Sequence, residues 1–245
     1  MSRLLVCDLD GTLLGDARSL AVLLELLRKP GAPVLAFASG RQGFSAIEAL
    51  RKWGVKDGSY LIAGVGSELY RRVGARWIQL ASWPRLNARW DVNHVRRELE
   101  AIPDLAEQPL SSRSPYKLSY FAPRAALSTV NDRLQSAAIH ATVVHSHGDL
   151  LDVLPGGVDK GSAVTWLSKL LSIGFERTMT CGNTENDLAM LRLPCPGIIV
   201  GEADPELVEA STSLPNVFLA SEACAAGILE GLRFFGWSNG IDWAA

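Results

Sequence analysis

Residues 4–12 read LLVCDLDGT, and the way this stretch ends shapes the interpretation of the whole chain. Its apolar first part is typical of a short buried strand, and the glycine and threonine that close it allow a sharp turn. Asp8 and Asp10 are two residues apart at the strand end, so both carboxylates point to the same side. Such a pair favours a divalent metal, with one carboxylate as ligand and the other free for proton transfer. The alternative is a turn with two solvated acids.

The composition predicts a folded protein with a sizeable core. The chain has 245 residues, 48% of them apolar, with a net charge of −2 and a pI of about 6.1. This length predicts one large domain or a domain with an insert. Because no basic stretch dominates, we do not expect nucleic acid or a membrane surface as a main partner. No apolar run is long enough to span a bilayer and no coiled-coil pattern is evident, so we expect a monomer.

The N-terminal residues and the cysteines favour a cytoplasmic protein. The first apolar run meets Asp8 at once, whereas a signal peptide needs an apolar core of about 7–15 residues. The cysteines lack the spacing of a metal site, and we expect reduced, mostly buried thiols. They are Cys7, Cys181, Cys195 and Cys224.

Strand-like and helix-like segments alternate along most of the chain, which predicts a parallel sheet with right-handed crossovers. Before the insert, strands are expected over residues 2–9, 32–39 and 60–70, and helices over 19–29 and 43–54. After it, strands are expected over 176–182, 196–201 and 216–220, and helices over 161–174, 185–193, 204–211 and 225–236. Between about Trp77 and Val153 the pattern changes to helices over 87–102 and 124–137 and strands over 116–122 and 140–147. This pattern indicates an inserted α+β unit.

Four polar segments fall where ligands of an open parallel sheet bind, at the carboxyl ends of the strands. They are DLDGT, ASGR, DKG and GNTEND, which begin at residues 8, 38, 159 and 182. Ser39, Gly40 and Arg41 open a helix and suit a phosphate, although an ordinary serine N-cap fits the same residues. Lys160 adds positive charge at a helix start that is already positive, so a nearby anion would remove the conflict. A solvated lysine is the alternative.

The fourth segment offers oxygen ligands. Asn183 follows the glycine, and Asp187 lies early in the next helix, where it suits capping or an indirect metal contact. Each segment is a weak signal alone. Their order and their common place at four strand ends are a much more specific signal.

With these segments the chain resembles the haloacid dehalogenase superfamily of phosphatases. DLDGT matches the first motif, SGR the second, Lys160-Gly161 the third and GNTEND the fourth. VGSELY, the helix containing Trp90, SPYKLSY and LLDVLPGGVDKG are similar to the sucrose-phosphatase group within it. The resemblance implies an α/β fold with a Rossmann-like parallel-sheet core domain, residues 1–80 and 158–245. It also implies an inserted α+β cap domain of the larger, C2 type, residues 81–157.

The resemblance also implies the chemistry of the matched residues. Asp8 would be the nucleophile that forms an aspartyl-phosphate, and Asp10 would be the general acid and later the base. The phosphate would be bound by the remaining residues of the second and third motifs, Ser39, Gly40, Arg41 and Lys160.

A magnesium ion is implied by the same resemblance. Its ligands would be Asp8, Asp10, Asn183 and Asp187, and few protein contacts suffice because Mg²⁺ usually keeps several waters. The family normally has an aspartate where this chain has Asn183, so we expect weaker Mg²⁺ binding and low activity. The sucrose-phosphatase group often has an asparagine at Gly11, so DLDGT is the more general form.

Further candidates lie in or near the predicted cap. We interpret Lys117 as a contact to a sugar hydroxyl, with a surface lysine as the alternative, and Glu68 as an acceptor for another hydroxyl. Three tryptophans, Trp77, Trp83 and Trp90, either pack or stack on a sugar. His145 and His147 alternate on one strand and are expected to be exposed polar residues rather than a metal pair.

The sequence therefore predicts a Mg²⁺-dependent phosphatase acting on a small-molecule sugar phosphate. The first expectation is a phosphorylated disaccharide, namely sucrose 6-phosphate. Mannosylfructose phosphate and other sugar phosphates are alternatives. A different class is a catalytically weak sugar-phosphate-binding module, which Asn183 favours. The retention of five matched residues opposes it, namely Asp8, Asp10, Ser39, Lys160 and Asp187.

Overall fold

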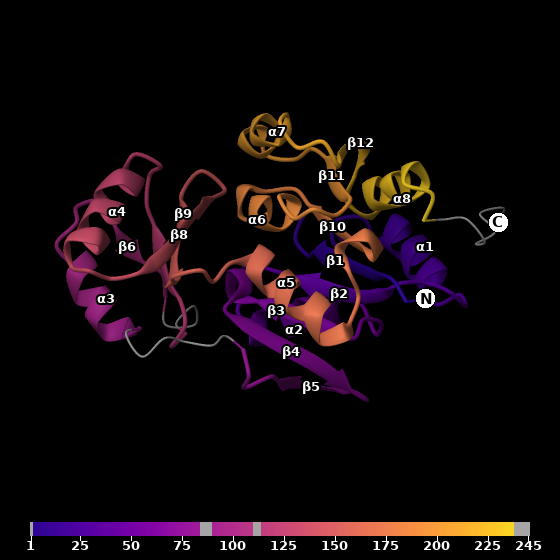
Figure 1. Cartoon of the computed structure of the whole chain (residues 1–245), viewed down its shortest axis with the longest axis horizontal. Coiled ribbons are helices and arrows are strands. Elements are labelled where there is room, and N and C mark those ends of the chain that lie inside the picture. The colour runs from indigo at the N-terminus through magenta and orange to yellow at the C-terminus, as the bar shows by residue number, and fades with distance from the viewer. Residues whose placement is uncertain (1, 84–89, 110–113, 238–245) are drawn as a thin grey trace.

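The computed structural model describes residues 2–83, 90–109 and 114–237. They form two parts, a core built on one large sheet and a smaller domain with its own sheet (Figure 1). Both the parallel core and the inserted α+β unit are as the sequence predicted, so the α/β fold class is confirmed. The proposed division into core and cap at residues 81 and 157 stays a prediction. None of the described helices combines the length and apolarity needed to cross a membrane.

The core sheet has eight strands in the order β12-β11-β10-β1-β2-β3-β4-β5. Its parallel strands are β1 (Leu4–Asp8), β2 (Val34–Ala38), β3 (Tyr60–Ala63), β10 (Thr178–Gly182), β11 (Gly197–Gly201) and β12 (Val217–Ala223). The antiparallel edge is β4 (Glu68–Val73) and β5 (Arg76–Gln79). Since β1 lies between β2 and β10, the first, second and fourth motifs follow neighbouring strands.

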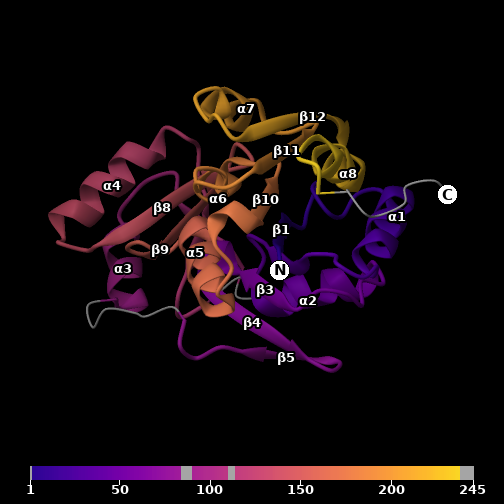
Figure 2. The ribbon, with the colours of Figure 1, turned by 45° about the vertical axis from the view of Figure 1, so that its right-hand side comes forward.

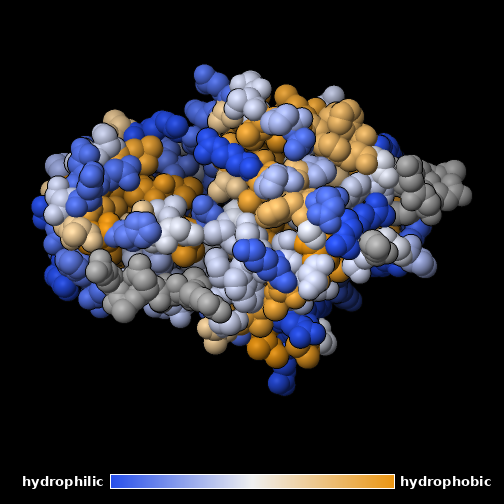
Figure 3. Space-filling view, viewed as in Figure 1, coloured by the Kyte–Doolittle hydropathy of each residue, from blue (hydrophilic) through white to orange (hydrophobic). Residues whose placement is uncertain are grey.

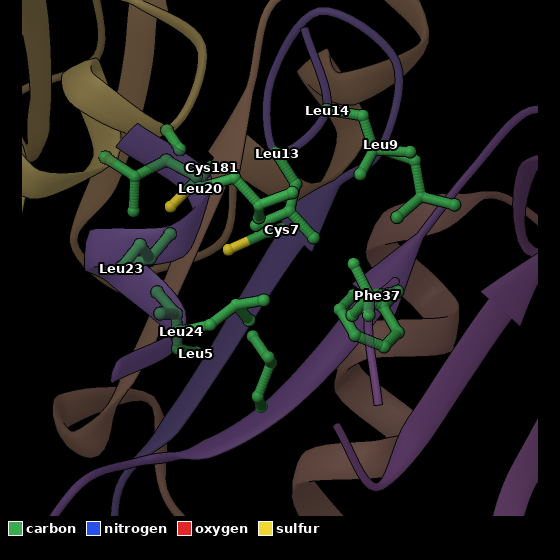
Figure 4. Close-up of a cluster of buried hydrophobic side chains, with 14 of the residues drawn as sticks. Leu5, Cys7, Leu9, Leu13, Leu14, Leu20, Leu23, Leu24, Phe37 and Cys181 are labelled. Carbon is green, nitrogen blue, oxygen red and sulfur yellow. The ribbon is translucent and has the colours of Figure 1, made fainter. Parts of the chain in front are cut away.

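Helices cover both faces of this sheet because side chains along a strand alternate between its faces. Leu5 and Cys7 of β1 pack in one cluster with α1, α2 and α8, while Leu4 and Val6 pack in another with α5. Figure 4 shows the first cluster, in which Leu23 and Leu24 of α1 approach β1, and Figure 2 shows α1 beside α8. The helices are α1 (Ala17–Leu27), α2 (Gly43–Lys52), α5 (Lys160–Leu171), α6 (Leu188–Leu191), α7 (Pro205–Ser211) and α8 (Cys224–Phe234).

The smaller domain is an antiparallel sheet covered by two helices. Its strand order is β6-β7-β9-β8, formed by β6 (Ala106–Glu107), β7 (Leu118–Phe121), β8 (Ala141–Ser146) and β9 (Leu150–Pro155). The helices are α3 (Val92–Leu99) and α4 (Ala126–Ser136). Val95 and Val130 from these helices pack with Leu151 and Val153 of β9, which gives the domain its own core.

Residues 60–70 form two strands where the sequence predicted one. A 3-10 turn over Gly64–Gly66 reverses the chain, and β4 then pairs antiparallel with β3. The turn needs a left-handed backbone, with φ of 58° at Gly64, 57° at Val65 and 103° at Gly66, and the two glycines adopt it at low cost. The sequence prediction also missed β5, β6 and β9. Of the helix expected over 87–102, residues 87–89 lie outside the described residues.

The two chain segments that connect the domains meet at Gly66. The Trp83 indole Nε1 donates to the Gly66 carbonyl oxygen over 2.8 Å. A Cβ on Gly66 would lie 2.2 Å from the Asp159 carbonyl oxygen, so the returning segment passes directly over this glycine. Trp83 also packs against Trp166 of α5, with ring centroids 5.8 Å apart. The connection between the domains is therefore a packed junction.

Candidate active site

The site is centred on Asp8, the last residue of β1. Asp8 is 5% exposed, and its Oδ1 accepts a hydrogen bond from Lys160 Nζ at 2.7 Å. Burial, and after it the negative charge of Asp187, raise the pKa of Asp8 to about 7, although Lys160 opposes the shift. A buried carboxylate in this position favours a cation or a proton nearby.

Lys160 is fully buried and connects three motifs. Besides Asp8, its Nζ donates to Asn186 Oδ1 at 2.5 Å and to Asp187 Oδ1 at 2.6 Å. Burial lowers the pKa of Lys160, but Asp187 and Asp8 more than offset this, so the pKa lies above its ordinary value. Lys160 is the first residue of α5, which Asp159 caps by accepting from Ser162 N. The lysine predicted as a phosphate ligand is therefore an ammonium held by two buried carboxylates.

The fourth motif is held rigid by Asp187 and Thr12. Asp187 Oδ2 accepts from the backbone N–H groups of Asn183 and Thr184, both at 3.0 Å. Asn183 Oδ1 accepts from Thr12 Oγ1 at 2.8 Å. A Cβ on Gly11, whose φ is 77°, would lie 2.4 Å from Asn183 Nδ2, so a glycine is needed there. The side-chain oxygen of Asn183 is thus already engaged by the first motif.

Asp10 and Arg41 form a bidentate ion pair at the cleft surface. Arg41 Nε lies 2.7 Å from Asp10 Oδ2, and Nη2 lies 2.8 Å from Oδ1. Both side chains are about half exposed, at 44% and 45%. Ser39 is fully buried, and its Oγ accepts from the Arg41 backbone N–H at 3.1 Å. Ser39 therefore orients Arg41, and Arg41 in turn holds Asp10, the predicted general acid.

A cleft of about 660 Å³ lies between this cluster and the smaller domain. Its described lining joins Asp8, Asp10, Gly40 and Arg41 of the core to polar residues of the other domain. Those polar residues are Gln108, Lys117, Ser146, His147 and Asp152. Hydrophilic side chains are spread over both domains in the view of Figure 3. The cleft thus places a carboxylate cluster opposite a wall rich in hydrogen-bonding groups.

Lys117 spans the cleft from the smaller domain. It is 5% exposed, and its Nζ donates to Asp152 Oδ1 at 2.8 Å and to the Gly40 carbonyl oxygen at 3.2 Å. Ser119 Oγ donates to the same Asp152 oxygen at 2.6 Å. The alternative of a surface lysine is therefore wrong, because the side chain is buried at the contact between the two domains.

Glu68 is not among the described residues that line the cleft. Its Oε2 accepts from Tyr70 OH at 2.5 Å and from the Gly43 backbone N–H at 3.3 Å. These bonds link β4 to the first turn of α2, beside the second motif. The placement supports a structural role rather than the predicted sugar contact.

The tryptophans and histidines are used mainly in packing. Trp77 contacts Phe37 edge to face with ring centroids 6.3 Å apart, and Trp90 Nε1 donates to the Pro115 carbonyl oxygen at 2.9 Å. The expectation that His145 is an exposed polar residue is wrong, because it is 6% exposed. It faces the core domain, whereas His147 lines the cleft.

Several residues of the site were missed by sequence reasoning. Asn186 bonds Lys160, and its position in GNTEND was the available signal. Asp152 interrupts the apolar run LLDVLP, which indicates a partnered charge on a buried strand. Phe44 lines the cleft although it is 81% exposed, and Gln108 carries no signal that the sequence alone reveals.

The donor set fits a hard cation such as Mg²⁺. Asp8 and Asp187 are two buried carboxylates facing one lysine, so the buried charge is not neutralised by Lys160 alone. Carboxylate and amide oxygens of this kind are the ligands that Mg²⁺ prefers. Within the described ranges, no three His, Cys, Asp or Glu side chains are gathered as a preformed metal cluster. The acids are instead paired with Lys160 and Arg41.

Comparison with known proteins gives a family match over nearly the whole chain. The family model described as sucrose-6F-phosphate phosphohydrolase matches residues 1–236. A mannosylfructose-phosphate phosphatase from Agrobacterium fabrum is 34% identical, with 96% of this chain and 97% of that protein covered. Sucrose-phosphatase 2 of Nicotiana tabacum is 28% identical over 94% of this chain, which spans only 58% of the tobacco protein.

Solved structures agree with the fold. A sucrose-phosphatase from Synechocystis sp. PCC6803, determined with sucrose and phosphate, superposes with a TM-score of 0.89 at 29% identity, covering 96% of this chain and 99% of that one. A Bacteroides thetaiotaomicron phosphatase of the haloalkanoate (HAD) enzyme superfamily has a TM-score of 0.69 at 16% identity, with 96% of each chain covered. At that identity the second likeness concerns the fold alone.

Proposed function

The chain belongs to the sucrose-6F-phosphate phosphohydrolase family, and we propose that it is a phosphatase that removes phosphate from a phosphorylated disaccharide. The observation that carries this proposal is the buried Asp8–Lys160–Asp187 cluster at the base of a cleft whose other wall is polar. A nucleophile, a cation and a covering domain are the parts that phosphoryl transfer requires.

In the first step of the proposed reaction, an Asp8 oxygen attacks the phosphorus atom. The bond between phosphorus and the sugar oxygen breaks, and Asp10 gives a proton to that leaving oxygen. The products are an aspartyl-phosphate and a free sugar. Lys160, at 2.7 Å, favours the ionised form of Asp8 that this attack requires, and so opposes the burial that raises the pKa of Asp8 to about 7.

In the second step, water attacks the phosphorus of the aspartyl-phosphate. Asp10 takes a proton from the water, the acyl-phosphate bond breaks, and inorganic phosphate leaves with Asp8 restored. Arg41 orients the Asp10 carboxylate through two hydrogen bonds. This would keep Asp10 in reach of the sugar oxygen in the first step and of the attacking water in the second. Lys160, Ser39 and the backbone of Gly40 would offset charge on the phosphoryl oxygens.

Magnesium is part of this proposal. Asp8, the Asp10 carbonyl, Asn183 and Asp187 would hold it, and when bound it would offset negative charge on the phosphoryl group. The two buried carboxylates that share one lysine support a further cation at this place. Asn183 brings one negative charge fewer than an aspartate, so we propose weaker Mg²⁺ binding than in relatives with the acid.

Recognition of the sugar is proposed for the polar cap wall and the mouth of the cleft. Among the described residues, the buried Gln42 Nε2 has no hydrogen-bond partner, and Gln42 lines the cleft. A sugar hydroxyl would satisfy it. Lys117 and Asp152 offer further donors and acceptors, and the exposed Phe44 ring offers an apolar face to a sugar ring.

The proposed substrate is sucrose 6-phosphate, supported by the family match and by the likeness to the Synechocystis enzyme. Mannosylfructose phosphate is the second candidate, supported by the 34% identity to the Agrobacterium protein over nearly its whole length. A catalytically weak binding module is favoured by one observation, the engagement of Asn183 Oδ1 by Thr12. The cytoplasmic location and the monomeric state stay predictions.

The test is phosphate release from sucrose 6-phosphate, mannosylfructose phosphate and several monosaccharide phosphates, with and without Mg²⁺. We expect release from a disaccharide phosphate only with Mg²⁺, and loss of turnover in Asp8→Asn by at least about 10³-fold. Circular dichroism should show that this variant keeps the fold. If no sugar phosphate is hydrolysed even at high Mg²⁺, while the protein still binds one, the binding module is the better description. Full activity of Asp8→Asn would remove Asp8 from the role of nucleophile.

A further inference from the structure

A second contact between the domains lies beside the fourth motif, on Glu185. Arg124, from the loop after β7, donates through Nη1 to Glu185 Oε1. His145 of β8 places its Nδ1 3.9 Å from Glu185 Oε2. Two cap side chains from different segments therefore converge on one core carboxylate, which is only 15% exposed.

His145 is fixed in this arrangement by its other nitrogen. Nε2 lies 3.1 Å from the Ala122 carbonyl oxygen, which can only accept, so Nε2 donates. Nδ1 then faces Glu185 and has no hydrogen-bond partner among the described residues. The imidazole is 6% exposed, so its position is set by packing against the core domain.

The surroundings of Glu185 favour a cation there. Asp187, a second carboxylate, lies two residues away in the same 3-10 turn. Carboxylates near one another repel unless a positive group is present. Arg124 is the cation paired with Glu185 in the structure, and it comes from the cap.

This contact adjoins the walls of the cleft. Thr184 and Asn186, on either side of Glu185, line the cleft, as do Ser146 and His147 next to His145. On another side, Lys117 reaches the Gly40 carbonyl oxygen at 3.2 Å. The cap is thus attached to the core at two places that lie on different strand ends, β2 and β10.

We propose that Glu185 is the docking residue of the cap, and that its ion pair with Arg124 holds the cap closed over the cleft, with the buried His145 packed beside it. The pair positions the cap wall against the phosphate cluster and does not itself touch the reacting atoms. The effect of this docking on the substrate rests on the proposed phosphatase function. The contact between the cap and the core does not depend on that function.

Hydrogen exchange in the absence of substrate tests the docking directly. We compare the wild type with Arg124→Ala and Glu185→Gln, and with Arg133→Ala as control, because Arg133 pairs with Glu98 inside the cap and is similarly exposed. Peptides covering residues 122–126 and 183–191 should exchange faster in Arg124→Ala and Glu185→Gln than in the wild type. In Arg133→Ala they should exchange at the wild-type rate. Exchange unchanged in Arg124→Ala and Glu185→Gln would overturn the proposal, whether or not the protein is an active phosphatase.

Kinetics separate docking from a role in the phosphate site. For the disaccharide phosphate we expect KM to rise by about two- to five-fold in Arg124→Ala and in Glu185→Gln, which is the size of effect typical of a partly exposed ion pair. The double variant should be no worse than either single one, since the same interaction is lost. With p-nitrophenyl phosphate, which has no sugar for the cap to bind, kcat/KM should stay within about two-fold. An equal loss on both substrates would assign Glu185 to the phosphate site and overturn the docking role.

Discussion

Asn183 is the residue at which this chain departs from the family pattern, and the structure gives it a defined position. Its Oδ1 accepts from Thr12, its backbone N–H donates to Asp187, and its Nδ2 fits against Gly11. These contacts hold the side chain between the first and fourth motifs. The neutral amide limits negative charge in a place where Asp8 and Asp187 already share one lysine.

We therefore expect Asn183→Asp to have opposite effects without and with Mg²⁺. Without the metal, the added charge next to two buried carboxylates should lower the melting temperature by a few degrees. With Mg²⁺ the extra anionic ligand should reverse this and lower the concentration needed for half-maximal stabilisation by about ten-fold. Thermal unfolding across a Mg²⁺ titration measures both effects. If the midpoint of the titration does not move, residue 183 is not near the metal.

Individual residues of the site were predictable where they belong to a short motif. The sequence identified Asp8, Asp10, Lys160 and Asp187 as one group, and the structure brings them together. It could not show that Lys160 is fully buried between two carboxylates, because this burial needs β1 and α5 to meet although Asp8 and Lys160 lie 152 residues apart in the sequence. Glu68 was placed in the sugar site because its bond to the Gly43 N–H, 25 residues away, depends on the unpredicted turn at Gly64–Gly66.

At the scale of elements, the start of α2 is fastened to the edge of the sheet. The Gly43 N–H donates to Glu68, and the Tyr70 hydroxyl donates to the same carboxylate oxygen. A Cβ on Gly43 would lie 2.2 Å from the Tyr70 hydroxyl oxygen and 2.4 Å from Cζ. The glycine thus allows the tyrosine ring to pass over the helix start that follows Arg41.

Gly43→Ala should destabilise the fold by about 1–3 kcal/mol because the ring must move from a packed position. Urea unfolding measures the change. Lys52→Ala, at the exposed end of the same helix, is the control and should stay within about 0.5 kcal/mol. In a Tyr70→Ala background the glycine change should become neutral or stabilising, because alanine favours a helix over glycine. An equal cost in both backgrounds would show that the ring is not the obstacle.

Most helices and strands were predictable from the periodicity of apolar residues, whereas the pairing of the strands was harder to predict. The run YLIAGVGSELY looks like one buried strand, and only the left-handed φ of Gly64, Val65 and Gly66 converts it into a hairpin. β9 was overlooked because Asp152 breaks its apolar run, and the lysine that pairs with it lies 35 residues away in the sequence. Partners this distant are set by tertiary structure, which local pattern does not contain.

At the scale of the molecule, the cap is joined to the core through the junction at Gly66. Both connecting segments touch this glycine, one through Trp83 and the other through the Asp159 carbonyl. Gly66 lies in the turn between β3 and β4, and Asp159 immediately precedes Lys160. A change at the junction therefore reaches both the cap orientation and the start of α5.

Gly66→Ala should lower the free energy of unfolding by more than about 2 kcal/mol, since it adds backbone strain and a clash with a main-chain oxygen. Gly74→Ala is the matched control: Gly74 also has a positive φ, of 60°, but a Cβ added there would meet no described atom within 4 Å. Both variants add backbone strain, but only Gly66→Ala places a Cβ against another atom. The difference between their free energies of unfolding in denaturant therefore measures the effect of the close approach. Equal losses at the two positions would show that the contact with Asp159 contributes nothing.

The place of β1 between β2 and β10 also bears on how the protein is made. Leu4 pairs with Val34 on one side but with Thr178 on the other, so one edge of β1 stays open until about three quarters of the chain has left the ribosome. Pairings this far apart in sequence form late and leave aggregation-prone edges exposed in the meantime. Asp8, Lys160 and Asp187 come together only when that pairing is complete, so we expect the site to form late in the synthesis of the chain.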